Sequence, residues 1–199
     1  MDSGNIGFVL LCAAFVFVMT PGLAMFYGGL VRKKNVVNTM MTSIFIIGVG
    51  IVMWVLFGYS LSFAPSGNAF IGDFRWLGLE GVSLTEGYTD DASIPNMVFS
   101  AFQMMFAVIT PALITGAVAG RMKFKSIFVF TIFWSLIVYY PLAHMVWGQG
   151  GLLGADGIGA LDFAGGDVVH ISSGVSALVL CILLGKRHDY EHSIYRIHN

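Results

Sequence analysis

Five long runs of apolar residues divide the chain, and polar or glycine-rich sequence separates each run from the next. A helix needs about 20 predominantly apolar residues to cross the roughly 30 Å hydrocarbon core of a bilayer. The runs reach this length, so the pattern predicts five transmembrane helices. They are expected at residues 6–31, 36–63, 95–120, 126–148 and 168–185.

Composition excludes an ordinary soluble domain. Of the 199 residues, 57% are hydrophobic and only 11% are charged, whereas soluble domains carry about 25% charged residues. We therefore expect an all-α, multi-pass membrane protein. The formal net charge of −1 gives no reason to expect a nucleic-acid partner. Cys12 and Cys181 lie in apolar runs and are expected to pack as small hydrophobic residues, without a disulfide or a metal.

The basic residues predict an orientation in the membrane. Every Lys and Arg except Arg75 lies in the connections 32–35 and 121–125 or after residue 185. Basic connections mark the cytoplasmic side, which places the N-terminus outside and the C-terminus inside, most naturally in the plasma membrane. Five crossings is an odd number, so a second such unit would enter the membrane from the opposite side. Inverted repeats of this kind build many transporters, and residues 1–199 are suited to be one such half.

Two ionisable side chains, Asp162 and His170, flank the start of the fifth predicted helix. Ionisable groups inside a bilayer are costly and usually mark a path for ions, protons or substrate. His170 is expected about one turn inside the helix and pointing into the bundle, where a neutral imidazole donates and accepts one hydrogen bond. A packing role, with one carbonyl holding the ring, is an equally good interpretation. Asp162 can likewise be a carboxylate that stabilises the start of the helix.

Aromatic residues are expected to meet in the same leaflet. Phe102 and Phe106 are i, i+4 neighbours on the third predicted helix and share a face, and Trp147 ends the fourth. A tryptophan ring attracts cations, and two stacked rings can plug a narrow pore. The alternatives are a tryptophan at the headgroup level and an ordinary apolar packing stripe.

The sequence gives little support for metal binding or catalysis. His144, Asp162 and His170 are a conceivable zinc set, but nothing in their spacing favours it. We recognise no phosphate-binding loop or catalytic constellation, so no enzymatic activity is expected. The polar loop 64–94 has no readable function. The glycine-rich connection 149–167 is expected to fold back into the outer end of the bundle, because glycine permits close backbone approach.

Taken together, these residues resemble the N-terminal half of ammonium transporters, the Amt/Mep/Rh superfamily, and are closest to its Amt branch. The resemblance extends over nearly the whole chain. Four stretches carry it: TPGLAMFYGGL with RKKN at 20–35, FQMMF at 102–106, AHMVWG at 143–148, and ALDFAGG with VVH at 160–170.

The resemblance implies a role for each matching residue. Phe102 and Trp147 match the outer site that recruits ammonium, and Phe106 matches the upper of two stacked gating phenylalanines. His170 matches the first of the twin histidines that line the pore. Asp162 matches an acidic residue that supports the structure and substrate selection without touching the ion. The pore is expected to strip a proton from ammonium, to pass ammonia along neutral imidazoles and to move the proton separately. Such a pore excludes potassium, which has no proton to lose.

The family fold is an eleven-helix bundle that forms homotrimers with one pore per subunit, and PII-type regulatory proteins dock on its cytoplasmic face. No cofactor is implied. The second pore histidine, the second stacked phenylalanine and a recruitment-site hydroxyl are expected from a second half. Asp167 departs from the family pattern, which has an uncharged or hydroxyl residue there. Three alternatives stay open: an ammonium sensor on the same fold, a transport-inactive fragment, and a neutral-solute channel of the urea type.

Overall fold

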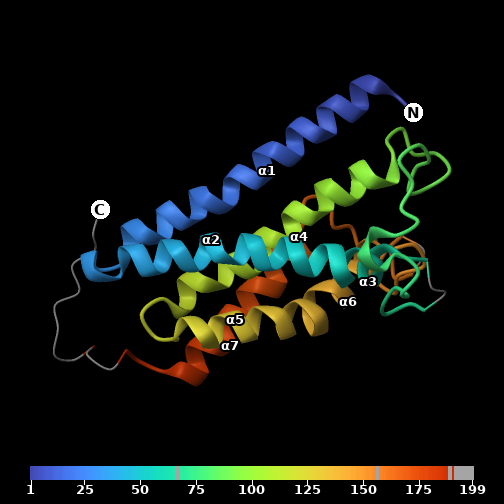
Figure 1. Cartoon of the computed structure of the whole chain (residues 1–199). Helices are drawn as coiled ribbons and strands as arrows, with labels where there is room; N and C mark the ends of the chain where they lie inside the picture. The colour runs from blue at the N-terminus through green and yellow to red at the C-terminus, as the bar shows by residue number, and fades with distance from the viewer. Residues whose placement is uncertain (66–67, 156, 188–189, 191–199) are drawn as a thin grey trace.

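The computed structural model describes residues 1–65, 68–155, 157–187 and 190, and in that part of the chain it contains helices and no strands (Figure 1). Among the described residues, five helical spans are long and apolar enough to cross a membrane, which confirms the five predicted helices with bounds shifted by a few residues. They are Ser3–Leu30, Lys33–Phe63, Asn96–Val118, Phe124–Trp147 and Gly166–Leu184.

Two spans are continuous helices, α1 (Ser3–Leu30) and α4 (Asn96–Val118), and the other three each contain a π-helical turn. The second span runs through η1 (Lys33–Asn35), α2 (Val36–Met53), the π turn η2 (Trp54–Gly58) and α3 (Tyr59–Phe63). The fourth joins α5 (Phe124–Trp134), the π turn η4 (Ser135–Tyr139) and α6 (Tyr140–Trp147). The fifth opens with the π turn η5 (Gly166–Ile171) and continues as α7 (Ser172–Leu184). Such turns change the face that the following residues present and often occur at functional sites.

Helix α4 is the central element of the bundle, because it packs against α1, α2 and α7 (Figure 1). Small residues permit the close contacts. A Cβ atom at Gly116 of α4 would lie within 2.8 Å of the ring of Tyr27, and one at Gly58 would lie 2.7 Å from the ring of Tyr140. The aromatic core beside η2 and η4 contains fully buried Trp54, together with the similarly buried rings Tyr59, Phe63, Tyr139 and Tyr140.

The outward faces of the helices are largely apolar, which suits contact with lipid or with further membrane helices. On α1, Phe8, Phe15, Val18 and Met25 are all more than half exposed. α7 exposes a similar stripe, which includes Leu178 and other aliphatic side chains.

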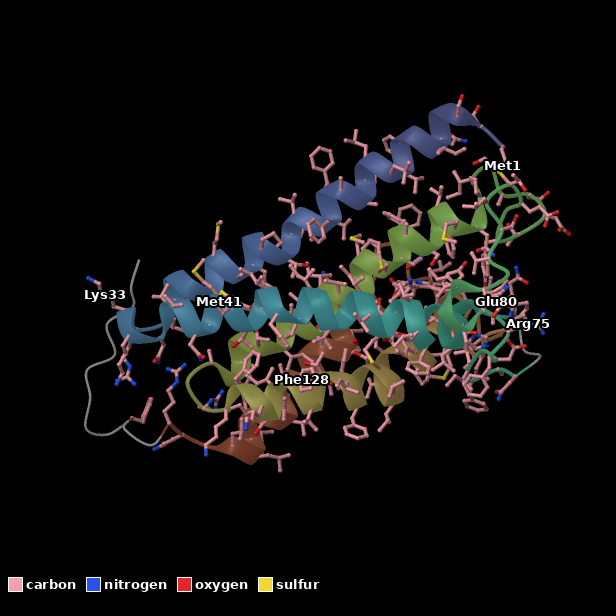
Figure 2. The ribbon with its side chains drawn as sticks, viewed as in Figure 1. Met1, Lys33, Met41, Arg75, Glu80 and Phe128 are labelled. Atoms are coloured by element: carbon pink, nitrogen blue, oxygen red, sulfur yellow. The ribbon has the colours of Figure 1, made fainter. Side chains whose placement is uncertain are left out.

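Charge separates the two ends of the bundle. Figure 2 places Lys33 at one end and Arg75 and Glu80 at the other. The described basic connections 32–35, 121–125 and 186–187 all lie at the Lys33 end (Figure 1), which we call the basic end. The loop 64–94 lies at the opposite end, which we call the outer end after its predicted orientation. Arg196 lies outside the described residues. The assignment of the basic end to the cytoplasm stays a prediction.

The connection 149–167 folds back over the outer end of α6, as its glycines predict. The backbone amides of Leu153 and Gly154 donate to the carbonyl oxygen of Met145 at 2.8 and 2.9 Å. The amide of Leu152 donates to the carbonyl of Ala69 at 2.9 Å, which ties the connection to the other outer loop. A single layer of irregular chain therefore covers the outer ends of α3 and α6.

Candidate functional site: an aromatic pocket at the outer end

A pocket of about 330 Å³ opens at the outer end of the bundle, between α4, the end of α6 and the last residues of the connection 149–167. Its walls are mostly aromatic, with one amide and one carboxylate side chain among them. The lining residues are Phe99, Phe102, Gln103, Phe106, Trp147, Asp162, Phe163, Ala164 and Gly165.

The three aromatic side chains singled out in the sequence meet in this pocket. Phe102 and Phe106 pack edge to face, with ring centroids 5.0 Å apart and an interplanar angle of 84°. The centroids of Phe106 and Trp147 are 6.5 Å apart. Phe102 and Trp147 both line this pocket, and Phe106 lies one helical turn further along α4 than Phe102. The rings come from α4 and from the last residue of α6, and the returning connection 149–167 closes the pocket beside them.

Asp162 organises the start of the fifth span through its carboxylate. Oδ1 accepts a hydrogen bond from the amide of Gly166 at 2.7 Å, and Oδ2 accepts from the amides of Asp167 and Val168 at 3.0 Å each. The first amides of a helix have no partners within the helix, and a negative charge is favourable beside them. Asp162 is thus a helix-start carboxylate, which is one of the two roles expected for it. Its carbonyl oxygen also accepts from the indole Nε1–H of Trp147 at 3.3 Å.

Gly165 allows the backbone turn that brings the Asp162 carboxylate to the amides of residues 166–168. Its φ of +77° lies in the left-handed region, which glycine adopts without strain. A Cβ atom there would also lie 2.9 Å from Cγ2 of Val169. Gly165 is therefore required for the turn that delivers Asp162 to the amides.

Gln103 is a pocket residue to which the sequence analysis assigned no role. Its amide oxygen Oε1 is buried, and it has no hydrogen-bond partner among the described residues. A buried acceptor without a partner costs about 1–3 kcal/mol, so such a group needs an explanation. Its position in the motif FQMMF was visible in the sequence. The lack of a hydrogen-bond partner for Oε1 depends on the surrounding side chains, so it could not be predicted from the sequence.

His170 lies apart from the aromatic pocket, in η5, and its side chain is exposed. The ring therefore faces away from the buried core of the helices described, and its expected place on a pore wall stays a prediction. The ring is exposed because His170 lies on the side of the fifth span opposite its buried stripe. Val168, Val169 and Ser172 form the buried stripe of the fifth span, and residue 170 projects from the opposite side.

His144 is fully buried one turn before Trp147. Its Nδ1 lies 3.1 Å from the carbonyl oxygen of Ser62, and its Nε2 lies 2.8 Å from that of Asn68. The ring thus joins α6 to the end of α3 and to the outer loop. Both of its nitrogens face backbone oxygens, so the conceivable zinc set with Asp162 and His170 is not assembled. No group of metal-binding side chains occurs among the described residues.

The fold and the pocket define a class: a multi-pass helical membrane protein with an aromatic-lined site at one mouth of the bundle. The chain belongs to the Ammonium Transporter Family, whose family model matches residues 7–199. This membership confirms the family resemblance found in the sequence.

Sequence similarity to individual proteins supports the same family. An ammonium transporter of Bacillus subtilis is 53% identical over 95% of this chain and 46% of its own length. An ammonium transporter of Aquifex aeolicus is 44% identical over 95% of this chain and 44% of its own length. The chain thus spans about half the length of the curated relatives it matches.

Solved structures confirm the fold. The crystal structure of Saccharomyces cerevisiae Mep2 matches all of this chain and 44% of its own, with 36% identity and a TM-score of 0.87. A protein described as a sensor Amt protein matches 93% of this chain and 45% of its own, with 27% identity and a TM-score of 0.80.

Proposed function

We propose that this chain supplies the first half of an ammonium-conducting pore. The observation that carries the proposal is the convergence of Phe102, Phe106 and Trp147 on one pocket at the outer end of a membrane bundle. The relatives named as ammonium transporters support the same substrate.

The pocket is suited to bind a small cation. A cation over an aromatic face gains about 0.5–1 kcal/mol at an exposed site and about 2 kcal/mol or more where it is desolvated. We assign Phe102 and Trp147 to recruitment and the Oε1 atom of Gln103 to accepting an N–H bond from ammonium. Asp162 contributes by fixing the turn and the indole, because its oxygens are occupied by backbone amides.

At the inner side of the pocket, Phe106 acts as a gate, and desolvation behind its ring favours loss of the ammonium proton, which then moves separately from ammonia past His170. We assign His170 to the wall of the passage that ammonia then follows. In this proposal the exposed side of η5 faces a second wall, which comes from the half of the fold that the relatives have and this chain does not match. Potassium cannot lose a proton, so such a passage excludes it.

The assembled protein is proposed to be a homotrimer in the plasma membrane, with its basic end in the cytoplasm. The positive-inside rule supports that orientation. A PII-type regulator would then meet the basic connections, and no nucleic-acid partner or cofactor is required. The function is transport rather than catalysis.

The experiment compares Trp147→Leu with Phe133→Leu in the complete protein, reconstituted in vesicles. Phe133 is an outward-facing ring of α5 with 58% of its surface exposed, so it serves as a matched control. We expect Trp147→Leu to raise the half-saturating ammonium concentration by about five- to thirtyfold, which corresponds to about 1–2 kcal/mol. Unchanged affinity in Trp147→Leu would favour a neutral-solute channel and contradict the proposal.

A second candidate function is ammonium sensing, which the similarity to a sensor Amt protein favours. Both functions use the same recruitment pocket. They differ in flux, since a sensor binds ammonium without conducting it at a useful rate. Binding that depends on Trp147, without any ammonium current across the vesicle membrane, would assign the chain to the sensor or to a transport-inactive fragment.

A further inference from the structure

Asp167 carries a carboxylate that takes no part in the lining of the aromatic pocket or in the cap of the fifth span. It is the second residue of η5, two residues after Gly165, which lines the pocket, and three residues before His170. Since consecutive Cα atoms are about 3.8 Å apart, the Cα atoms of Gly165 and Asp167 are separated by at most about 7.6 Å. Asp167 therefore lies between the pocket and the histidine.

The carboxylate of Asp167 is accessible and unpaired. Val168 and Val169, which follow it, are 0% and 3% exposed, whereas Asp167 is partly exposed and His170 is exposed. The backbone amide of Asp167 donates to Oδ2 of Asp162 at 3.0 Å. Its side-chain oxygens make no hydrogen bond or ion pair with any other described residue. Its charge is thus not neutralised by a neighbour in this part of the chain.

The start of the helix does not account for this second carboxylate. Asp162 already accepts from the amides of residues 166–168, and the amide of Val169 donates to the carbonyl oxygen of Gly165 at 3.0 Å. The first four amides of η5 therefore have acceptors without the side chain of Asp167. A further negative charge gains a little from the helix dipole, but it also repels the carboxylate of Asp162.

The outer end has little positive charge to set against Asp167. Among the described residues, Arg75 is the only Lys or Arg at that end, and its guanidinium is paired with the carboxylate of Asp73 at 2.7 Å. The remaining described Lys and Arg side chains lie in the connections at the basic end (Figure 1). A mouth with one sign of charge and low-dielectric walls concentrates ions of the opposite sign, so Asp167 favours cations there.

We propose that Asp167 is a specificity-determining residue of the aromatic pocket, whose fixed negative charge raises the affinity of the pocket for monovalent cations without touching them. The inference rests on the proposed transport function, because it assigns the pocket to a cation. It also separates two roles in recognition. The charge of Asp167 attracts every small cation, whereas the Oε1 atom of Gln103 favours one that donates N–H.

The experiment measures ammonium uptake by Asp167→Asn in the complete protein, reconstituted in phosphatidylcholine vesicles at two sodium chloride concentrations. At 10 mM salt we expect the half-saturating ammonium concentration to rise about three- to tenfold, because a unit charge about 10 Å from a cation attracts it across a medium less polarisable than water. At 1 M salt the rise should fall below about twofold, since the screening length shortens from about 30 Å to about 3 Å.

Two variants test whether charge is the cause. Asp167→Glu keeps the charge and should stay within about twofold of the unmodified protein, although its side chain is longer. Glu80→Gln is the matched control, because it removes the same charge from an exposed position in the loop 64–94, at the same end of the bundle (Figure 2). It should leave ammonium affinity unchanged. Thermal unfolding checks that each variant is folded, and Asp167→Ser replaces Asp167→Asn if the latter is not.

Competition by tetramethylammonium shows which cations the charge acts on. In Asp167→Asn this competition should weaken by the same factor as ammonium binding, because a charge that acts at a distance does not require N–H groups. A loss confined to ammonium would mean that Asp167 accepts a hydrogen bond from the substrate, and the proposed action at a distance would be wrong.

Three further results would overturn the proposal: unchanged ammonium affinity in Asp167→Asn at 10 mM salt, an equal loss at both salt concentrations, and no recovery in Asp167→Glu. Trp147→Leu separates this failure from that of the proposed function. If Trp147→Leu weakens ammonium binding while Asp167→Asn does not, the pocket keeps its function and only the role of Asp167 is wrong. If neither substitution changes the affinity, the recruitment pocket itself is wrong.

Discussion

The indole Nε1–H of Trp147 donates to the backbone carbonyl oxygen of Asp162 at 3.3 Å. The carboxylate of the same Asp162 caps the fifth membrane span through the amides of Gly166, Asp167 and Val168. Asp162 thus connects Trp147, in the wall of the aromatic pocket, to the start of the fifth membrane span. The position of the tryptophan ring and the stability of the helix start are therefore expected to change together.

We predict that Asp162→Ala lowers the free energy of unfolding by about 1–2 kcal/mol, because it removes a helix cap whose acceptor is charged. The half-saturating ammonium concentration should rise as well, since the turn that holds Trp147 loosens. Thermal unfolding in detergent and uptake by vesicles measure the two effects.

Asp162→Asn separates the charge from the shape of this cap. The amide retains one acceptor oxygen, so the loss of stability should be smaller than in Asp162→Ala. If Asp162→Ala instead left stability unchanged and abolished only binding, Asp162 would be contacting the ion directly, and the capping role would be wrong.

A second prediction concerns the contact between α1 and α4. An added Cβ at Gly116 would lie 2.5–2.8 Å from ring atoms of Tyr27, whose hydroxyl donates to the carbonyl of Leu113 at 2.9 Å. The ring cannot withdraw without giving up that bond, so Gly116→Ala should cost about 1–3 kcal/mol. Gly22→Ala, at an open position, should be close to neutral. Thermal unfolding of both variants checks the pair, and equal melting temperatures would show that α1 moves freely to accept the methyl group.

Much of the architecture followed from the sequence because membrane physics leaves few options. A run of about 20 apolar residues can cross a bilayer only as a helix or within a closed barrel, so the five spans were predictable. The glycines of the connection 149–167 predicted its return over α6. The meeting of Phe102 and Trp147 was foreseen from their common leaflet and from the family motifs.

The orientation of His170 was not predictable for a related physical reason. In a helix that is apolar on every side, hydrophobicity carries no information about which side is buried. Val168 and Val169 give no such signal beside His170, and the π turns change the register without any mark in the pattern. The partnerless Oε1 of Gln103 likewise depends on neighbours that only the three-dimensional arrangement specifies.

The third prediction concerns Tyr88 in the outer loop. Burial raises the pKa of its phenol to about 12, against the opposing effect of a hydrogen bond from the backbone amide of Gln149. The ring also stacks on Phe99, with centroids 4.8 Å apart. Since the folded-state pKa lies above the ordinary value of about 10, the stability linked to the protonated phenol is complete below pH 10 and is lost as the pH rises through about 12.

Thermal unfolding at a series of pH values compares the protein with Tyr88→Phe. The variant should be less stable near neutral pH by about 1 kcal/mol, because the amide of Gln149 loses its partner. The difference between the two proteins should shrink between pH 10 and 12. A constant difference over that interval would contradict the raised pKa of Tyr88.

The last prediction concerns the partnerless amide oxygen of Gln103 in the aromatic pocket. Ammonium carries four N–H donors, and a hydrogen bond that involves a charged group contributes about 1.5–3 kcal/mol. Gln103→Leu should therefore raise the half-saturating ammonium concentration about tenfold or more. The stability of the protein should not fall, because the substitution also removes a buried acceptor that has no described partner. Aromatic faces alone attract any small cation, whereas this oxygen adds a directed acceptor for N–H.

Met104→Leu is the control for Gln103→Leu, since Met104 is the next residue on α4 and packs against the buried core. It should leave ammonium affinity unchanged. A further measurement gives the substitution its chemical meaning: competition by tetramethylammonium, which has no N–H to donate and is not coordinated by an amide oxygen, should be unaffected in Gln103→Leu while ammonium binding weakens. Equal loss of affinity for both cations would mean that Gln103 only shapes the pocket, and the proposed hydrogen bond to ammonium would be wrong.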